Sequence, residues 1–142
     1  MRSLPPCLAL VLAALLSLDG DAFARSGGGR IVSSCGRHVL EVTRGRAVLD
    51  GRPVWRAREE ARVLSAPVWR RDGRAVAWLE RDGVETRLVV IAQVESATDA
   101  LPWPLPAVAS GDQVFWAAQN RVVVGPHLLA PRAVASWTET AR

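Results

Sequence analysis

The chain has 142 residues, with 18 basic and 14 acidic side chains and a formal net charge of +4, and every basic residue is an arginine. This length suits one small domain with a buried core. A basic balance can indicate nucleic-acid binding, but the arginines are dispersed among acids. The densest cluster, residues 56–62, includes Glu59 and Glu60. The charge pattern therefore does not favour nucleic acid, and we expect no such partner.

The first 24 residues have the three regions of a secretory signal peptide. Arg2 supplies a short positive region, Leu8–Leu18 is an apolar run, and Ala22–Ala24 has the A-x-A form of a cleavage site. The apolar run is too short to span a bilayer. We therefore expect removal of residues 1–24, a mature chain of 142 − 24 = 118 residues, and a periplasmic or secreted location without a membrane span.

The mature chain keeps one of the two cysteines, because Cys7 leaves with the signal peptide. A single cysteine excludes an intramolecular disulfide. A lone thiol in an exported chain is either buried or forms a disulfide between chains, and we expect Cys35 to be buried, since a free cysteine behaves as a small apolar residue. Residues 25–30, RSGGGR, are expected to form a flexible glycine-rich lead, followed by one all-β domain over residues 31–142.

Three apolar runs recur at regular spacing along this domain. They begin at Val39, Val76 and Val114, which are 76 − 39 = 37 and 114 − 76 = 38 residues apart. Turns follow at Gly45, Gly83 and Asn120, and second β-rich runs follow at Arg46–Leu49, Arg87–Ile91 and Arg121–Val124. The spacing predicts three antiparallel repeats of about 37 residues.

Each repeat continues into a segment that contains proline and tryptophan. The segments are Pro53–Trp55, Leu101–Trp103 and Leu129–Trp137. Proline is tolerated in edge strands and not in central ones, so we expect these segments at the rims of their sheets.

The stretch Ala66–Ile91 has the clearest local pattern, predicting strand, turn, strand, hairpin and strand. Asp72-Gly73 and Asp82-Gly83 are turn dipeptides, and we expect each aspartate to bond to its own backbone. The run Ala75–Leu79 is apolar on both faces. A sheet with one wet face would alternate apolar and polar residues, so this strand is predicted to be covered on both sides.

The same stretch resembles a known repeat. Its matching residues are Pro67, Trp69, Asp72, Gly73, Val76, Ala77 and Trp78, which are similar to the P-x-W-S-P-D-G-x-x-I-A-F box of TolB-type propeller repeats. Arg70-Arg71 stands in place of Ser-Pro, and the match covers about one repeat. The resemblance implies blade-like sheets and, since that family's propeller is a rigid scaffold for other envelope proteins, a binding role without catalysis.

Three repeats are too few for a propeller ring, which closes with four to eight blades. A β-trefoil and an open β-sandwich are the alternative folds. The candidate end edges, Ile31–Ser34 and Ala133–Trp137, have no charge or proline. Unprotected edges pair with other strands, so we expect closure, self-association or a protein partner through these edges.

Catalytic signals are few. Cys35 and His38 could form a thiol–base pair, but zinc needs three or four ligands and His127 is the other histidine. The acidic residues that could form a glycosidase pair are Glu41, Asp50, Glu80, Asp82, Glu85, Asp99 and Asp112. Nothing singles out two of them, so we expect a non-enzyme without cofactor or metal.

Six tryptophans are unusual in so short a chain. Trp69, Trp78 and Trp116 fall within or beside inner strands and are expected to pack in the core. Trp55, Trp103 and Trp137 are candidates for an aromatic sugar platform, although packing is the favoured reading for these too. The sequence thus predicts an exported protein-binding scaffold, with a small carbohydrate-binding module as the alternative and an exported enzyme less favoured.

Overall fold

The computed structural model describes residues 28–58, 60–96, 100–105, 112–118, 121–126, 131 and 133–136. Regular structure in these ranges consists of twelve β-strands without a helix. The strands are β1 (Gly28–Val32), β2 (Val39–Thr43), β3 (Arg46–Leu49), β4 (Arg52–Arg56), β5 (Arg62–Val63), β6 (Val68–Trp69), β7 (Val76–Asp82), β8 (Glu85–Ile91), β9 (Leu101–Leu105), β10 (Gln113–Ala117), β11 (Arg121–Gly125) and β12 (Ala133–Ser136). No helix that could cross a membrane is found in these ranges.

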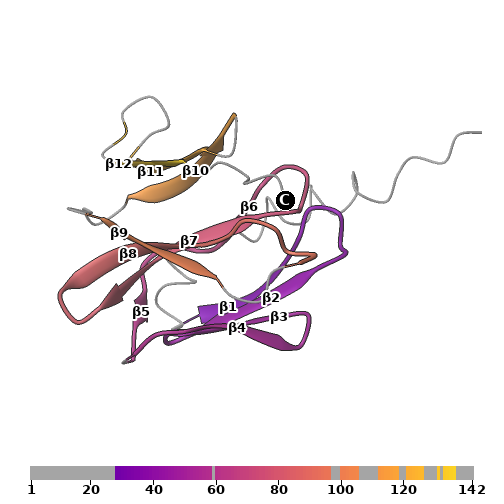
Figure 1. The fold of residues 1–142 in the computed structure, drawn as a ribbon, viewed down its shortest axis with the longest axis horizontal. Coiled ribbons are helices and arrows are strands. Elements are labelled where there is room, and N and C mark those ends of the chain that lie inside the picture. The colour runs from indigo at the N-terminus through magenta and orange to yellow at the C-terminus, as the bar shows by residue number, and fades with distance from the viewer. Residues whose placement is uncertain are drawn as a thin grey trace, which may run out of the picture.

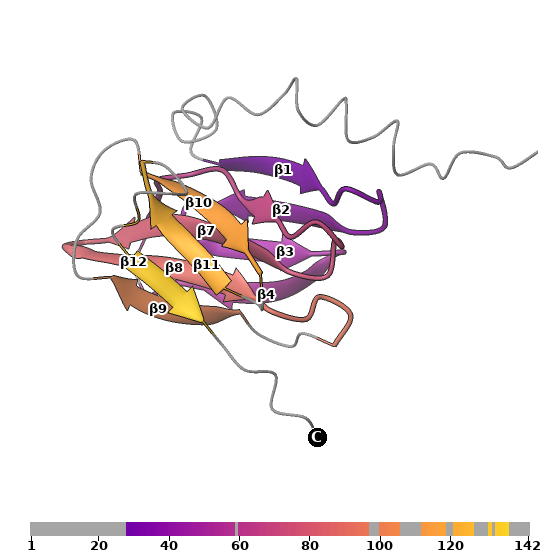
Figure 2. The ribbon, with the colours of Figure 1, turned by 90° about the horizontal axis from the view of Figure 1, so that it is seen from above.

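The strands form three sheets, in which all pairs are antiparallel. Sheet A has the order β1-β2-β3-β4, sheet B has the order β5-β7-β8-β9 with β6 also on β7, and sheet C has the order β10-β11-β12. Figure 1 shows sheet B as the middle layer, with sheet A below it and sheet C above it. In the view from above, the strands of sheet C lie across those of sheet B (Figure 2).

The predicted all-β class with antiparallel sheets is confirmed, and the first two strands of each predicted repeat pair with each other within one sheet, whereas β5 and β6, which fall in the first repeat, pair with β7 of the second. β2 and β7 begin at Val39 and Val76, and β10 begins one residue before Val114. Pro53–Trp55 lies in β4 and Leu101–Trp103 lies in β9, which are edge strands of sheets A and B. Of the third segment, Leu129–Trp137, residues 133–136 form the edge strand β12 of sheet C, and Pro131 precedes this strand. Among the described strands no ladder joins one sheet to another, so the sheets are open at their edges.

Sheet B is buried on both faces, as its apolar pattern predicted. Val76, Trp78 and Val89 pack toward sheet A in a core that includes Leu40 and Leu49. A second cluster on the opposite face packs against sheet C; its members are Ala77, Leu79, Leu88, Val90, Val114, Val122 and Val124. Trp78 is fully buried. The stacking of three sheets therefore depends on strands β7 and β8, which are apolar on both sides.

Sheet A has a wet outer face. Leu40 and Val42 of β2 are fully buried, whereas Glu41 and Thr43 between and after them are exposed. This alternation is the pattern of a sheet with one solvated side. Sheet A therefore forms one end of the stack.

Two sequence-based expectations about the start of the domain need correction. Gly28, Gly29 and Arg30 belong to β1 and pair with β2, so this part of the expected flexible lead is ordered strand. Cys35 is half-buried in the loop between β1 and β2, not fully buried. Residues 1–27, including the expected signal peptide, lie outside the described residues.

The two expected end edges are in different sheets. β1 is an edge of sheet A and β12 an edge of sheet C, and no ladder joins the two strands in the described ranges. Ser33 and Ser34 follow β1 in a loop. Trp137 lies outside the described residues.

Candidate functional site

A buried polar cluster links sheets A and B. Glu80 of β7 is Cα partner to Arg87 of β8, on the face that Trp78 presents to sheet A. The Arg87 Nε–H donates to Glu80 Oε1 at 2.9 Å, and Trp55 Nε1–H of β4 donates to the same oxygen at 3.0 Å. Glu80 is fully buried. Three strands of two sheets therefore meet at one carboxylate oxygen.

Arg87 also holds a second carboxylate. Its Nη2 donates to Asp82 Oδ2, and its guanidinium carbon lies 5.3 Å from the centre of the Trp55 ring. Burial alone would lower the pKa of Arg87, but the hydrogen bonds to Asp82 and Glu80 raise that pKa above its usual value. The guanidinium is thus a fixed positive charge between two acids, and it cannot act as a proton donor near neutral pH.

A second polar cluster lies at the loop between β1 and β2. His38 Nδ1 and Asp50 Oδ2 are 2.7 Å apart, and Asp50 Oδ1 accepts the Val39 N–H at 2.8 Å. Partial burial would raise the pKa of Asp50, but the hydrogen bonds from His38 and Val39 hold it below the usual value. The His38 ring stacks on Trp69 of sheet B, with centroids 6.3 Å apart.

In the described part of the chain, no cysteine or serine side chain forms a hydrogen bond with the His38 ring. Among the described residues no hydrogen bond joins Cys35 to His38. Ser33 is buried, and its Oγ accepts the backbone N–H of His38 at 3.1 Å. A histidine and a carboxylate held in this way are two of the three members of a catalytic triad, which also needs a nucleophile. Here the His38 ring instead stacks on Trp69 and joins sheet A to sheet B.

The turn at Asp72-Gly73 has the predicted geometry. Asp72 Oδ1 accepts the Arg74 N–H at 2.9 Å, and Gly73 has a φ of +71°, which glycine adopts without strain. Arg70 donates to both oxygens of Asp72, at 2.9 and 2.8 Å. Ser34 Oγ donates to the carbonyl oxygen of Arg71 at 3.2 Å, so this turn packs on the loop of sheet A.

Arg70, one of the two arginines at which the sequence differs from the repeat it resembles, contacts sheet C. The Arg70 guanidinium carbon lies 5.7 Å from the centre of the Trp116 ring in β10. Trp116 Nε1–H in turn donates to the carbonyl oxygen of Val68 at 2.7 Å. These two contacts connect sheet C to the β6 end of sheet B.

The second turn aspartate differs from expectation. Gly83 has a φ of +59°, as a tight hairpin turn requires, but the Asp82 carboxylate binds Arg87 and not its own backbone. Of the acidic candidates, Glu80 and Asp82 are the two that one arginine brings together. Asp99 lies outside the described residues.

The three rim tryptophans do not share a common environment. Trp55 is partly buried, donates a hydrogen bond to Glu80 and lies against the Arg87 guanidinium. Trp103 of the edge strand β9 is 40% exposed, beside Leu101 at 57%. With Trp137 outside the described residues, Trp103 is the candidate that presents its ring to solvent.

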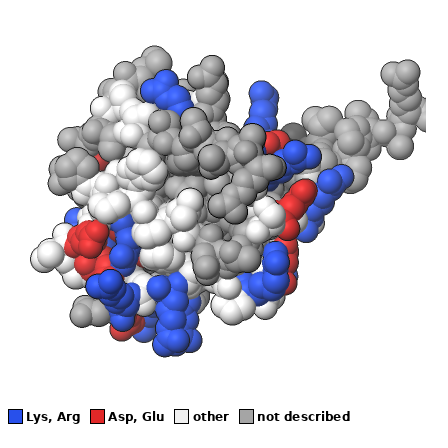
Figure 3. Space-filling view, viewed as in Figure 1, with Lys and Arg blue, Asp and Glu red and all other residues white. Residues whose placement is uncertain are grey.

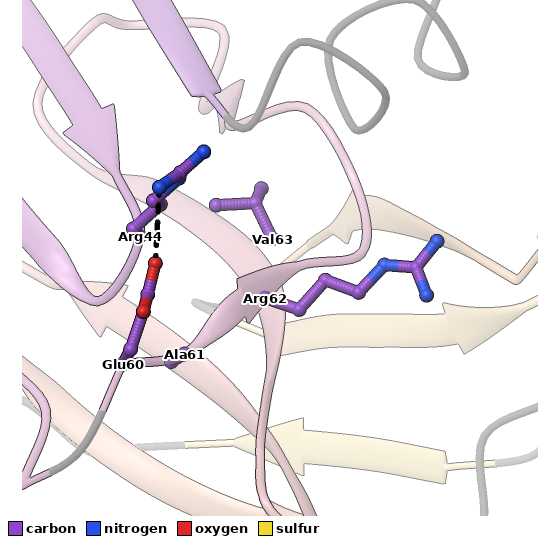
Figure 4. Close-up of a pocket in the computed structure, with 5 residues that line it drawn as sticks. All are labelled: Arg44, Glu60, Ala61, Arg62 and Val63. Carbon is purple, nitrogen blue, oxygen red and sulfur yellow. Dashed lines mark ion pairs between the residues drawn. The ribbon is translucent and has the colours of Figure 1, made fainter.

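One open depression of about 310 Å³ is lined by Arg44, Glu60, Ala61, Arg62 and Val63. Figure 4 shows Arg44 and Glu60 facing each other, with the Arg62 side chain directed away. Their ion pair is 3.2 Å long, and both side chains are largely exposed, so the pair contributes little stability. On the face shown in Figure 3, arginines and acids lie next to each other toward the edges of the view.

Within the described ranges, no group of three or more His, Cys, Asp or Glu side chains is placed to hold a metal ion. In the comparisons with known proteins, no protein-family model, curated protein or solved structure matches the chain.

Proposed function

We propose that the protein is an exported, non-catalytic scaffold that binds another protein of the cell envelope. The observation that supports this proposal is that the side chains that could take part in catalysis form structural contacts instead. Glu80 and Arg87 bind Trp55, and His38 binds Asp50 and stacks on Trp69, so each group connects neighbouring sheets. Side chains fixed in this way stabilise a rigid scaffold, and the resemblance of Ala66–Ile91 to TolB-type repeats supports a protein partner.

Cross-linking in intact cells tests this proposal. The full chain would carry a photo-reactive residue at Val84, which is fully exposed in the β7–β8 turn, or at exposed Arg30 in β1. We expect one defined envelope protein to be joined to at least one site, with the same product after purification and reconstitution. Turnover of an added substrate that is lost in His38→Ala would contradict a non-catalytic role.

A carbohydrate-binding module is the second candidate. The exposure of Trp103 and Leu101 on the β9 edge favours it, because exposed aromatic rings stack on sugars. Retention of the protein on immobilised polysaccharides, abolished by Trp103→Ala and unchanged by Val84→Ala, would support this function. If both variants and the parent chain were retained equally on the polysaccharide, Trp103 would be excluded as a sugar platform.

A further inference from the structure

The edges of sheets A and B are not equally protected against strand addition. Natural proteins protect edges with proline, bulges and very short strands. β4 has Pro53 and a register shift at Ala47/Val48, and β9 has Pro102 and Pro104. The opposite edge of sheet B is divided into β5 and β6, which have two residues each. β1 has five residues and no proline, bulge or interruption, and Arg30 is its one charged residue.

The β1 edge presents backbone groups in an ordered row. Ser33 N–H donates to the His38 carbonyl oxygen at 2.9 Å, so the backbone of Ser33 faces β2. In an antiparallel pair, the backbone N–H and C=O groups of successive residues point alternately toward and away from the neighbouring strand. Those of Val32 and Arg30 therefore point away from β2. Within the described ranges neither residue has a partner strand on that side.

The side chains beside this edge define what would fit. Arg30 is 67% exposed, with its guanidinium 3.9 Å from Glu41 on the β2 side. Val32 is 38% exposed on the same face, and Ile31 on the core face is half-buried, although its β2 partner Leu40 is fully buried. An added strand would complete the burial of Ile31, and an acid opposite Arg30 would form a second cross-strand ion pair.

A second copy of the chain fits this edge less well. Antiparallel pairing of two β1 strands, centred on Arg30 or Ile31, would place the two Arg30 side chains opposite or diagonal to each other. Like charges at such positions oppose pairing. Arg46 and Arg56, which are Cα partners on the same outer face, add further positive charge.

We propose that the open edge of β1 binds an extended segment of a partner protein by strand addition, with an acidic residue opposite Arg30 between apolar residues. This inference rests on the proposed protein-binding function and names the kind of partner segment. Affinity comes from the backbone groups of Arg30 and Val32, and selectivity comes from the Arg30 charge and the Ile31 side chain, as in other cases of strand addition.

A synthetic peptide with the sequence of residues 38–44, HVLEVTR, is a suitable probe, because β2 already pairs with β1 and places Glu41 opposite Arg30. We expect saturable binding to the mature protein and new protection of the Arg30 and Val32 amides from hydrogen exchange. Val32→Pro removes an outward N–H without breaking the β1–β2 ladder, so it should weaken binding about ten-fold. Its matched control, Ile31→Pro, removes an inward N–H and should lower stability.

Charge reversal gives an independent test. A peptide with Lys in place of the glutamate should bind the parent chain more weakly, and Arg30→Glu should reverse this preference. No binding, protection confined to other amides, or the same affinity for Val32→Pro would overturn the proposal. A dimer that protects Val32 without peptide would also overturn it, in favour of a second copy. A cross-linked envelope partner that Val32→Pro still binds would overturn strand addition and leave the proposed function intact.

Discussion

Trp55 Nε1 and Glu80 Oε1 are 3.0 Å apart, and this hydrogen bond connects the edge strand of sheet A to a central strand of sheet B. The Glu80 carboxylate is fully buried, and Arg87 supplies the compensating charge. Glu80 Oε2 has no hydrogen-bond partner among the described residues. A buried carboxylate in this position depends strongly on the single arginine beside it.

Replacement of Arg87 should therefore be severe. Arg87→Met leaves Glu80 and Asp82 without their shared cation, and loss of one member of a buried ion pair costs about 3–5 kcal/mol. Arg81→Met is the matched control, because Arg81 is exposed and, among the described side chains, bonds to Thr86 Oγ1 alone at 3.3 Å; it should cost less than about 1 kcal/mol. Urea unfolding of both variants measures the difference, and equal losses would contradict a structural role for the cluster.

Trp78 and Trp103 should differ in their contribution to stability. Trp78→Ala would empty a fully buried site between sheets A and B and should cost about 3–5 kcal/mol. Trp103 is 40% exposed on β9, so Trp103→Ala should cost clearly less. Chemical denaturation of the two variants measures this difference in stability. Similar unfolding midpoints would contradict the placement of Trp78 in the core and of Trp103 at an exposed edge.

The turn at Gly73 should not accept a β-branched residue. Gly73→Val forces a φ of +71° on valine, which should cost about 1–3 kcal/mol. Arg74→Val changes the neighbouring exposed residue and keeps the hydrogen bond from its backbone N–H to Asp72. Thermal melting should separate the two variants by several degrees, and an unchanged melting temperature for Gly73→Val would rule out a positive φ at this turn position.

Asp72 should contribute stability that depends on pH. The hydrogen bond from Arg70 lowers its pKa, burial opposes this, and the Arg74 N–H lowers it further. Because the folded pKa lies below the unfolded one, the contribution is full above about pH 4 and is lost as pH falls through the folded pKa. The stability difference between the parent chain and Asp72→Asn should therefore shrink in acid. A difference that stays constant down to strongly acidic pH would contradict this linkage.

Export should remove the first 24 residues. Mass spectrometry of the protein isolated from the envelope or medium should show Arg25 as its first residue. Persistence of Met1 in this fraction would exclude cleavage at Ala22–Ala24.

The middle sheet could be predicted because its pattern is local. The apolar residues on both faces of β7 indicated cover on both sides, and the Asp72-Gly73 and Asp82-Gly83 dipeptides marked the turns that bound this strand. Asp50-Gly51 carries the same kind of signal. Its φ values of +50° and +80° form the tight β3–β4 hairpin, which the repeat spacing alone did not reveal.

The contacts between sheets could not be read from the sequence. Trp55 lies on an edge strand, as expected, but the sequence did not reveal the irregular pairing at Ala47/Val48, which lets both Val54 and Trp55 face the core. His38 and Asp50 are twelve residues apart in the sequence, and the pairing of β2 with β3 between them brings the two side chains into contact. Glu80 had one available signal, since it lies two residues after Trp78 and therefore on the same face of β7.

The polar outer face of sheet A limits how this architecture can be lengthened. A further sheet stacked before sheet A would bury Glu41 and Thr43, together with the exposed arginines Arg30, Arg46 and Arg56. Burial of charged groups is costly even where two of them form an ion pair, as Arg30 and Glu41 do, so a duplicated repeat inserted before β1 would be destabilising unless these residues changed with it. A repeat inserted after β9 would instead meet the apolar face of Ala77 and Leu79. Gene duplication can therefore add a repeat between sheets B and C, while the first repeat keeps the role of a cap.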